Sequence, residues 1–177
     1  MEILNETWMQ VDGYAKFYVS NFGRVKNIEN NRMITLTNIK GYDVCRLSKT
    51  HRPYVHKLVA SAFIPNPHGL PVVDHIDGHP SNNHVNNLRW ATIQNNNRNR
   101  TKHITTTYSK YKGVSWDKRR NDKKDKTKKW VVHLRYNGRL LYIGSFINEE
   151  TAGRAYDDKA VELFGEFARL NFPEEWE

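Results

Sequence analysis

A basic stretch divides this chain and limits what it can fold into. Between Arg98 and Lys129 stand 13 lysines and arginines and only three acids, a net charge of +10, whereas the rest of the 177 residues nets −1. A chain of this length suits one medium domain or two to three small modules with thin cores. We therefore expect a modular protein with a basic linker and insertion over residues 105–130.

A positive field this concentrated indicates a polyanionic partner, either nucleic acid or an anionic membrane. From charge alone, the alternative that the basic stretch is only a solvated linker remains open. The membrane fits less well because no apolar run approaches the roughly 20 residues of a spanning helix, and the basic stretch has no apolar face. The start of the chain lacks the pattern of a signal peptide, so we expect an intracellular protein. Cys45, the only cysteine, lies in an apolar alternation and is expected in the core.

The segments before residue 105 predict two structural parts. Short alternating runs separated by turn residues predict a small antiparallel sheet over about residues 8–47, within a module of residues 1–50 that carries no obvious chemistry. Apolar residues at helical spacing from Val55 to Phe63 predict a helix that stops before Pro65. His56 lies off this stripe and is expected to be a structural or surface histidine. A strand ending at His75, a polar loop, a second strand over 87–92 and a helix beginning near Gln94 complete a part over residues 51–104.

Residues 111–177 predict a three-stranded antiparallel sheet packed on one helix. The turn Asn137-Gly138 between two apolar runs is a strong hairpin signal. Asn148 is expected to cap the helix, and Gly165 to end it. Alternation along the strands places one set of residues toward the helix, Trp130, Val132, Leu134, Leu141 and Ile143, and another set on the opposite face, Val131, His133, Arg135, Leu140 and Tyr142.

The candidate chemistry lies at the end of the strand before residue 76. Asp74 stands beside His75, with Asn87 and Asn96 downstream. Phosphodiester hydrolysis calls for such a set, because a hard cation needs oxygen ligands and water needs a base that works at neutral pH. From local spacing alone, the alternative that these residues only cap turns stays open.

A longer string carries a family resemblance: Asp74-His75-x-Asp77-Gly78-x-x-x-Asn82-Asn83-x-x-x-Asn87-Leu88-Arg89-Trp90-x-Thr92. With Val55 to Ala60 and Trp8 to Lys26, it resembles HNH homing endonucleases of the phage, intron and giant-virus type, together with the N-terminal module that accompanies them. The resemblance covers roughly residues 7–100. It implies a ββα-metal fold and hydrolysis of duplex DNA to 5′-phosphate and 3′-hydroxyl ends.

Carried over by motif, the resemblance gives each residue a role. Asp74 and Asn96 would bind one divalent cation, His75 would be the general base, and Asn87 would orient His75. Many relatives have histidine at the position of Asn96, and an oxygen-rich site favours Mg²⁺ or Mn²⁺ over Zn²⁺. Because Asn95, Asn96 and Asn97 follow one another, the ligand assignment stays open by one residue.

The C-terminal residues resemble the DNA-binding domain of plant ethylene-response (APETALA-type) factors. The matching motifs include Tyr111-Lys112-Gly113-Val114, Ala152-x-x-Ala155-Tyr156-Asp157 and Arg169-Leu170-Asn171-Phe172-Pro173. The resemblance implies that the sheet enters the major groove. Ser115 and Leu140 replace arginines of the plant proteins, so their target sequence does not transfer. The candidate DNA contacts are Arg98, Arg100, Lys112, Lys118, Arg119, Arg120, Lys128, Lys129, His133, Arg135 and Tyr142.

Together these features predict an α+β, Mg²⁺- or Mn²⁺-dependent endonuclease that acts on double-stranded DNA as a monomer, without an obligate protein partner. We expect it in the cytoplasm or nucleus of a host cell, encoded by a virus, phage or mobile element. The alternative is a non-catalytic DNA-binding regulator with a vestigial nuclease fold. An RNA-binding module is disfavoured because no aromatic stacking platform is evident.

Overall fold

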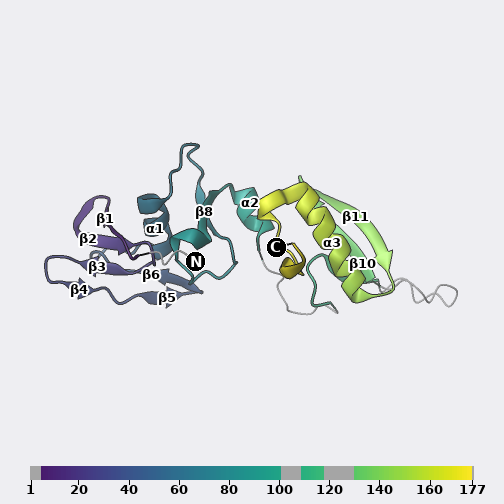
Figure 1. Cartoon of the computed structure of the whole chain (residues 1–177), viewed down its shortest axis with the longest axis horizontal. Coiled ribbons are helices and arrows are strands. Elements are labelled where there is room, and N and C mark those ends of the chain that lie inside the picture. The colour runs from purple at the N-terminus through teal and green to yellow at the C-terminus, as the bar shows by residue number, and fades with distance from the viewer. Residues whose placement is uncertain (1–4, 101–108, 118–129, 177) are drawn as a thin grey trace. The chain divides into compact units, whose positions relative to one another are not determined.

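The computed structural model of the chain describes residues 5–100, 109–117 and 130–176. The chain divides into two compact units, Met1–Asn96 and Asn97–Glu177. Small antiparallel sheets and helices make up both units (Figure 1), which confirms the predicted α+β class. The module boundaries expected near residues 50, 104 and 111 stay predictions.

Antiparallel strands form the N-terminal part of the first unit. Strands β1 (Trp8–Val11), β2 (Tyr14–Ser20), β3 (Val25–Asn27) and β4 (Arg32–Met33) make one sheet in that order, while β5 (Thr37–Ile39) and β6 (Tyr42–Val44) pair separately. The single sheet predicted over residues 8–47 is therefore two sheets. The break falls at Ile34 and Leu36, whose side chains pack against the core between β4 and β5.

The remainder of the first unit has the predicted order of strand, loop, strand and helix. Helix α1 (Val55–Phe63) ends before Pro65, as expected. Strands β7 (Val72–His75) and β8 (Leu88–Ala91) pair antiparallel, and the loop between them ends in the short 3-10 helix η1 (Val85–Asn87). Helix α2 (Ile93–Arg98) follows, with its start fixed because the Thr92 hydroxyl accepts a hydrogen bond from the Asn95 amide at 3.1 Å.

One hydrophobic core joins the N-terminal strands to α1, β7 and β8. Cys45 is fully buried there, as predicted, and burial raises the pKa of its thiol to about 11. A thiol with so high a pKa is a poor nucleophile at neutral pH. The buried members come from both sides of residue 50, so the two predicted parts fold around shared side chains: Val11, Phe17, Val19, Val25, Cys45, Leu47, Val55, Val59, Ala60, Val73 and Leu88.

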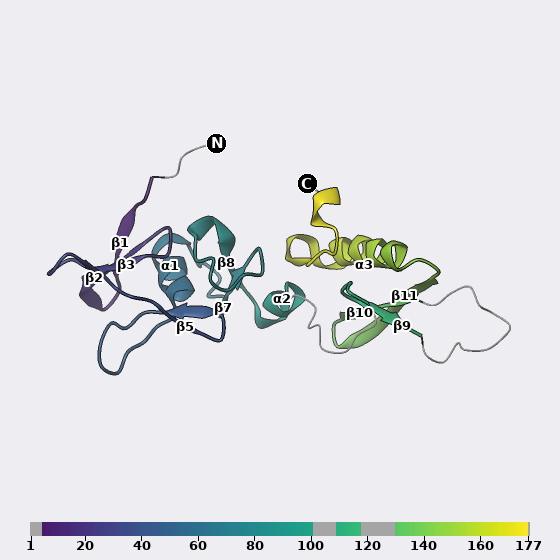
Figure 2. The same ribbon diagram turned by 90° about the horizontal axis from the view of Figure 1, so that it is seen from below.

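The second unit is a three-stranded sheet covered on one face by a helix (Figure 2). Strand β10 (Trp130–Tyr136) lies between β9 (Val114–Trp116) and β11 (Arg139–Phe146), and α3 (Glu149–Phe164) packs on them. Asn137 and Gly138 have φ of 48° and 79°, which confirms the predicted hairpin turn. The predicted faces are confirmed at four positions, since Val132 and Leu134 are buried under α3 while Leu140 and Tyr142 are each 60% exposed. Val131, predicted on the outer face, is nevertheless buried.

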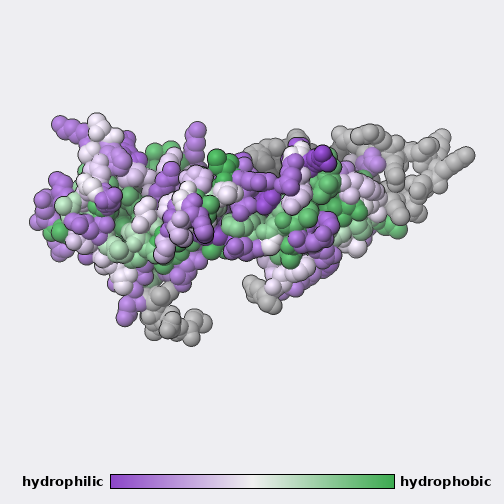
Figure 3. Space-filling view, turned by 90° about the horizontal axis from the view of Figure 1, so that it is seen from above, coloured by the Kyte–Doolittle hydropathy of each residue, from purple (hydrophilic) through white to green (hydrophobic). Residues whose placement is uncertain are grey.

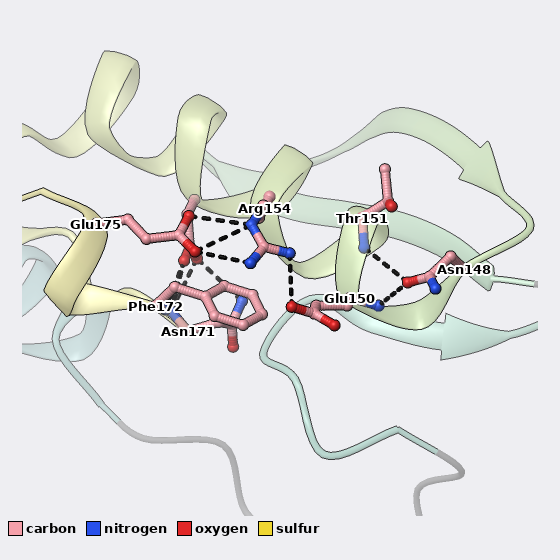
Figure 4. A network of polar contacts seen from close by, with 8 residues as sticks. Asn148, Glu150, Thr151, Arg154, Asn171, Phe172 and Glu175 are labelled. Atoms are coloured by element: carbon pink, nitrogen blue, oxygen red, sulfur yellow. Dashed lines mark hydrogen bonds and ion pairs between the residues drawn. The ribbon is translucent and has the colours of Figure 1, made fainter.

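Polar contacts cap the start of α3 and fasten the C-terminal segment to the helix (Figure 4). The Asn148 side chain accepts from the amides of Glu150 and Thr151, which confirms the predicted cap, and Gly165 ends the helix with φ 52°. Further along, the buried Asp157 carboxylate accepts from the backbone amides of Asn171 and Phe172 at 2.8 to 2.9 Å. These bonds fasten the chain after the 3-10 helix η3 (Gly165–Phe167), up to η4 (Pro173–Glu175), back onto the helix.

The surface of the described residues mixes polar and apolar side chains, and on the face drawn in Figure 3 hydrophobic residues lie among hydrophilic ones. Within residues 5–100, 109–117 and 130–176, every helix is too short or too polar to cross a bilayer.

Candidate functional site

The candidate site lies at the end of β7, where Asp74 and His75 are 3% and 6% exposed. In the antiparallel pair, Asp74 lies opposite Arg89 of β8, and His75 lies opposite Leu88. The predicted carboxylate and base are thus adjacent and both largely withdrawn from water. Burial at this level is unusual for charged and polar residues unless they are paired.

Arg89 is the partner of Asp74. Its Nε and Nη2 atoms each lie 2.9 Å from Oδ2 of Asp74, and both side chains are mostly buried. Charge-assisted bonds of this kind are short and directional, so they hold the carboxylate in one orientation. Arg89 belongs to the HNH-like string of residues 74–92, but the spacing of residues in that string did not predict that Arg89 pairs with Asp74.

His75 is surrounded by side chains from several elements. Its Nε2 lies 3.5 Å from Oδ1 of Asn83, and its ring lies 5.0 Å from that of His56 and 6.0 Å from that of Tyr42. Burial lowers the pKa of His75, against the opposing effects of Asn83 and nearby carboxylates. An imidazole with a lowered pKa is neutral at pH 7 and can accept a proton from water.

His56 is buried, so of the two positions that the sequence left open, structural and surface, the structural one is confirmed. The ring is 6% exposed and stacks on Tyr54 at 5.4 Å. Among the described residues, its Nδ1 atom is buried without a hydrogen-bond partner. The pattern of apolar residues along α1 did not predict this burial, because the His56 ring packs toward β6 and β7 rather than along the apolar face of the helix.

Asn87 closes the loop between β7 and β8. Its Nδ2 donates to Oδ1 of Asp77 at 2.9 Å and to the carbonyl of Asn82 at 2.8 Å, and its Oδ1 accepts from the Asp77 amide at 3.0 Å. The Asn87 carbonyl accepts from the amide of Ile76, the residue after His75. These contacts act on the backbone next to His75, while a direct role in orienting the ring stays a prediction.

Asn96 lies on α2, half-buried, and its amide donates to the Thr92 carbonyl at 3.0 Å in the first turn. Asn95 is also half-buried and Asn97 is exposed, so the assignment of the ligand within this run stays a prediction. Among the described residues, no three His, Cys, Asp or Glu side chains gather as a metal site. The expected site, however, has one carboxylate and one amide.

This donor set fits a hard divalent cation. Carboxylate and amide oxygens are the ligands of Mg²⁺ and similar ions, which keep several waters and take further oxygens from substrate phosphates. A carboxylate has about four acceptor positions, and both bonds from Arg89 end on the Oδ2 atom of Asp74. The pairing with Arg89 is therefore compatible with a cation held by the same carboxylate.

Two of the predicted DNA contacts are engaged within the second unit. The Arg98 guanidinium lies 4.6 Å from the centre of the Phe164 ring, and its carbonyl accepts from the Lys112 ammonium. Burial lowers the pKa of Lys112 to about 8, with the charge of Arg169 adding to the effect. Both side chains help to pack this unit, and their contact with DNA stays a prediction.

The remaining candidates differ in how they are presented. Arg100, Arg135 and Tyr142 are exposed, and His133 is half-buried with its ring 5.6 Å from that of Tyr142. His133 and Tyr142 therefore lie side by side on the face of the sheet opposite α3, as predicted. Five candidates lie outside the described residues: Lys118, Arg119, Arg120, Lys128 and Lys129.

Trp116 of β9 packs edge-on against Trp130 of β10, with the ring centres 4.8 Å apart.

Comparison with known proteins identifies two motifs in the first unit. Residues 6–56 match the NUMOD4 motif, and residues 54–98 match the HNH endonuclease family. The uncharacterized HNH endonuclease L245 of Acanthamoeba polyphaga mimivirus is 36% identical over 92 residues, 50% of this chain and 28% of the viral protein. These matches confirm the predicted HNH endonuclease domain and its N-terminal accompanying module.

Two further relatives cover different amounts of the chain. DNA endonuclease I-HmuI of Bacillus phage SP01 is 35% identical over 113 residues, 61% of this chain and 65% of the phage protein. The solved structure titled "DNA binding and cleavage by the HNH homing endonuclease I-HmuI" is 37% identical, with a TM-score of 0.48 over 52% of this chain and 56% of that chain. Dehydration-responsive element-binding protein 2A of Arabidopsis thaliana is 43% identical over 47 residues, 25% of this chain and 14% of the plant protein. The plant resemblance is thus partial.

Proposed function

We propose that this chain, which carries an HNH endonuclease domain, is a divalent-metal-dependent enzyme that hydrolyses duplex DNA to 5′-phosphate and 3′-hydroxyl ends. The observation that carries the proposal is the buried pair at the end of β7, a carboxylate oriented by Arg89 beside an imidazole whose pKa is lowered by burial. A base that is neutral at pH 7 next to a cation ligand is what hydrolysis of a phosphodiester requires.

Each residue has a role in this reaction. His75 takes the proton of the attacking water, while Asp74 and Asn96 hold one cation and Asn87 braces the backbone beside His75. The cation, when bound, stabilises the charge on the scissile phosphate and the leaving 3′ oxygen. Since this set contains only two protein ligands, both oxygen donors, we favour Mg²⁺ or Mn²⁺ over Zn²⁺.

The second unit would hold the DNA. The face of its sheet opposite α3 bears Arg135 and Tyr142, and part of the chain resembles plant DNA-binding proteins. The relatives of the first unit include proteins of a giant virus and a phage, one of which is called a homing endonuclease. We therefore infer a site-preferring nuclease of a mobile element, active as a monomer. A non-catalytic regulator is disfavoured because Asp74, His75, Asn87 and Asn96 are all present.

The test is cleavage of supercoiled plasmid with Mg²⁺, with Mn²⁺ and with chelator. We expect relaxed or linear product with either metal and none with chelator. His75→Ala should lower the rate by at least about 100-fold, because a general base contributes this much, and should leave DNA affinity in a gel-shift assay unchanged. His68→Ala, at an exposed position of the same unit, is the matched control. Cleavage by His75→Ala at the parent rate would falsify the assignment of the base.

A further inference from the structure

We propose that Leu140 is a specificity-determining residue, which selects thymine by contacting the 5-methyl group of the base in the major groove. This inference rests on one part of the proposed function, that the second unit holds duplex DNA. Leu140 lies on β11, on the face of the sheet opposite α3 (Figure 2), and is 60% exposed. Exposed leucines are common on protein surfaces, so its neighbours on the hairpin decide whether it has a role.

Four side chains of β10 and β11 form one patch on this face. His133 lies opposite Tyr142 in the ladder, and Arg135 lies opposite Leu140. The His133 and Tyr142 rings are 5.6 Å apart, and the Tyr142 hydroxyl lies 2.8 Å from that of Ser145. These contacts order the aromatic half of the patch beside Arg135 and Leu140. We call the four residues the hairpin patch: His133, Arg135, Leu140 and Tyr142.

The hairpin patch lies where the sheet narrows to two strands. Strand β9 pairs with residues 130–132 of β10. Beyond His133, whose amide donates to the Gly113 carbonyl at 2.9 Å, the ladder within residues 109–117 and 130–176 consists of β10 and β11 alone. The major groove of B-DNA is about 12 Å wide and admits a two-stranded ribbon of this kind. The shape of the hairpin therefore allows the patch to face base edges.

The charge around the hairpin patch fits a polyanion. The three strands β9, β10 and β11, all described, contain no aspartate or glutamate. Arg135 is exposed, and its Nη1 donates to the Gly138 carbonyl in the hairpin turn at 3.4 Å. A guanidinium has five N–H donors, so one bond to the turn leaves others for a base. An acid-free surface with a permanent positive charge favours DNA over a basic protein as the partner.

Arg135 and Leu140 suit different bases. Guanine presents two acceptors in the major groove that match an arginine fork, whereas thymine presents a methyl group, which an apolar side chain contacts. Residues directly opposite in an antiparallel ladder have Cβ atoms about 4.5–5.5 Å apart, and bases follow one another along a strand at about 3.4 Å. Arg135 and Leu140 can therefore reach neighbouring base pairs, and we expect a preferred site with a thymine close to a guanine.

The test begins with selection of duplexes from a random pool by the full chain, with EDTA present to prevent metal-dependent cleavage. Affinity is then measured for the selected duplex with each thymine replaced in turn by uracil, which lacks only the 5-methyl group. At one thymine at least, we expect the replacement to weaken binding by about 4-fold, the value of burying one methylene-sized group. This ratio should not change with salt, because a methyl contact releases no counterions. A parent chain that binds every uracil duplex as tightly as the thymine duplex would overturn the inference.

Variants of Leu140 connect the methyl group to this residue. Leu140→Ala should bind the thymine duplex about 4-fold more weakly than the parent and should no longer distinguish thymine from uracil. Leu140→Met keeps a long apolar side chain and should retain most of the discrimination. If Leu140→Ala discriminates as well as the parent, another residue contacts the methyl group and the assignment is wrong.

The matched control is Ile147→Ala, which shortens an apolar side chain of similar exposure, 68%, just after β11. It should discriminate like the parent. Thermal unfolding of each variant checks that a change in affinity does not come from loss of the fold. A loss of discrimination in Ile147→Ala equal to that in Leu140→Ala would contradict a specific role of Leu140.

A second replacement locates Arg135 on the same duplex. The 7-deaza analogue of guanine lacks one of the two acceptors that an arginine fork contacts. One such replacement should weaken binding of the parent but not of Arg135→Ala, at a guanine next to the thymine that Leu140 contacts. A sensitive guanine far from that thymine would refute the paired reading.

The outcomes separate this inference from the nuclease proposal, because binding is measured without cleavage. A chain that distinguishes thymine from uracil but never cuts DNA refutes the nuclease and supports the role of Leu140. A chain that cuts DNA but binds thymine and uracil duplexes equally refutes the role of Leu140 alone.

Discussion

Lowering the pH from 7 to 4.5 is expected to destabilise the first unit, and His56 accounts for a separable part of the loss. Burial lowers the pKa of this ring to about 4, with repulsion from His75 and Lys57 adding to the effect. The unfolded chain takes up a proton on this histidine below about pH 6.5. The folded chain resists protonation until about pH 4, so stability is present above pH 6.5 and is lost as the pH falls through this window.

The gap between the two pKa values corresponds to a free energy of up to about 3 kcal/mol once the pH reaches the lower value. His56 is only 6% exposed, so solvent screens little of it. The Nδ1 atom has no hydrogen-bond partner among the described residues, which means that a proton on this ring would be buried with nothing to accept from it there. A loss of this size is a large share of the stability of a small domain.

The assay is urea unfolding of the parent and of His56→Phe at several pH values between 7 and 4.5. Phenylalanine keeps a ring against Tyr54 and His75 but cannot take a proton. The difference between the two proteins isolates this position, since the second unit is the same in both. The variant should lose less stability than the parent on acidification, whereas His68→Phe, at an exposed position, should follow the parent. Identical pH dependence in the parent and in His56→Phe would refute the reasoning.

Two further predictions concern the second unit. Asp157→Ala leaves the backbone amides of Asn171 and Phe172 without the carboxylate that accepts from them. The free energy of unfolding of the second unit should therefore fall by roughly 2–4 kcal/mol, measured by thermal unfolding. An unchanged unfolding midpoint would contradict this role of the carboxylate. The slope of log affinity against log salt on duplex DNA should be about −5 to −7 if roughly six to eight cations neutralise phosphates. Replacing five lysines by Ala should flatten this slope for all DNA sequences alike; the five are Lys123, Lys124, Lys126, Lys128 and Lys129. An unchanged slope would mean that other residues contact the phosphates.

Local signals in the sequence were sufficient for most of the fold. The Asn137-Gly138 turn, the Asn148 cap and the apolar stripe of α1 each depend on residues within one or two turns of each other, and each is found where the sequence predicts it. The division of the N-terminal sheet was missed for the opposite reason. Ile34 and Leu36 read as a strand by alternation, but their side chains are recruited by a core whose other members are far away in the sequence.

The site could be predicted only in part, because motif spacing identifies residue types and says little about their partners. Asp74 and His75 are adjacent in sequence and stand out by their chemistry. The partners of His75 come from elsewhere: Asn83 through the loop, His56 from α1 and Tyr42 from β6. Such contacts depend on how the elements pack. The position of His56 relative to the apolar face of its own helix therefore gives no information about them.

The charge count that dominates the sequence overstates what is available to DNA. Lys112 and Arg98 lie within the basic stretch, yet one donates to the carbonyl of the other, and the Arg98 guanidinium lies over Phe164. Long basic side chains can pack along apolar surface, so a lysine or arginine counted as a phosphate contact can serve the core of its own unit. At pH 8 the pKa of about 8 also leaves Lys112 only partly charged. Of the 13 basic residues of the stretch, 11 then remain as candidates for phosphate binding, among them the exposed Arg100 and Lys110, and this number is enough for the expected salt dependence.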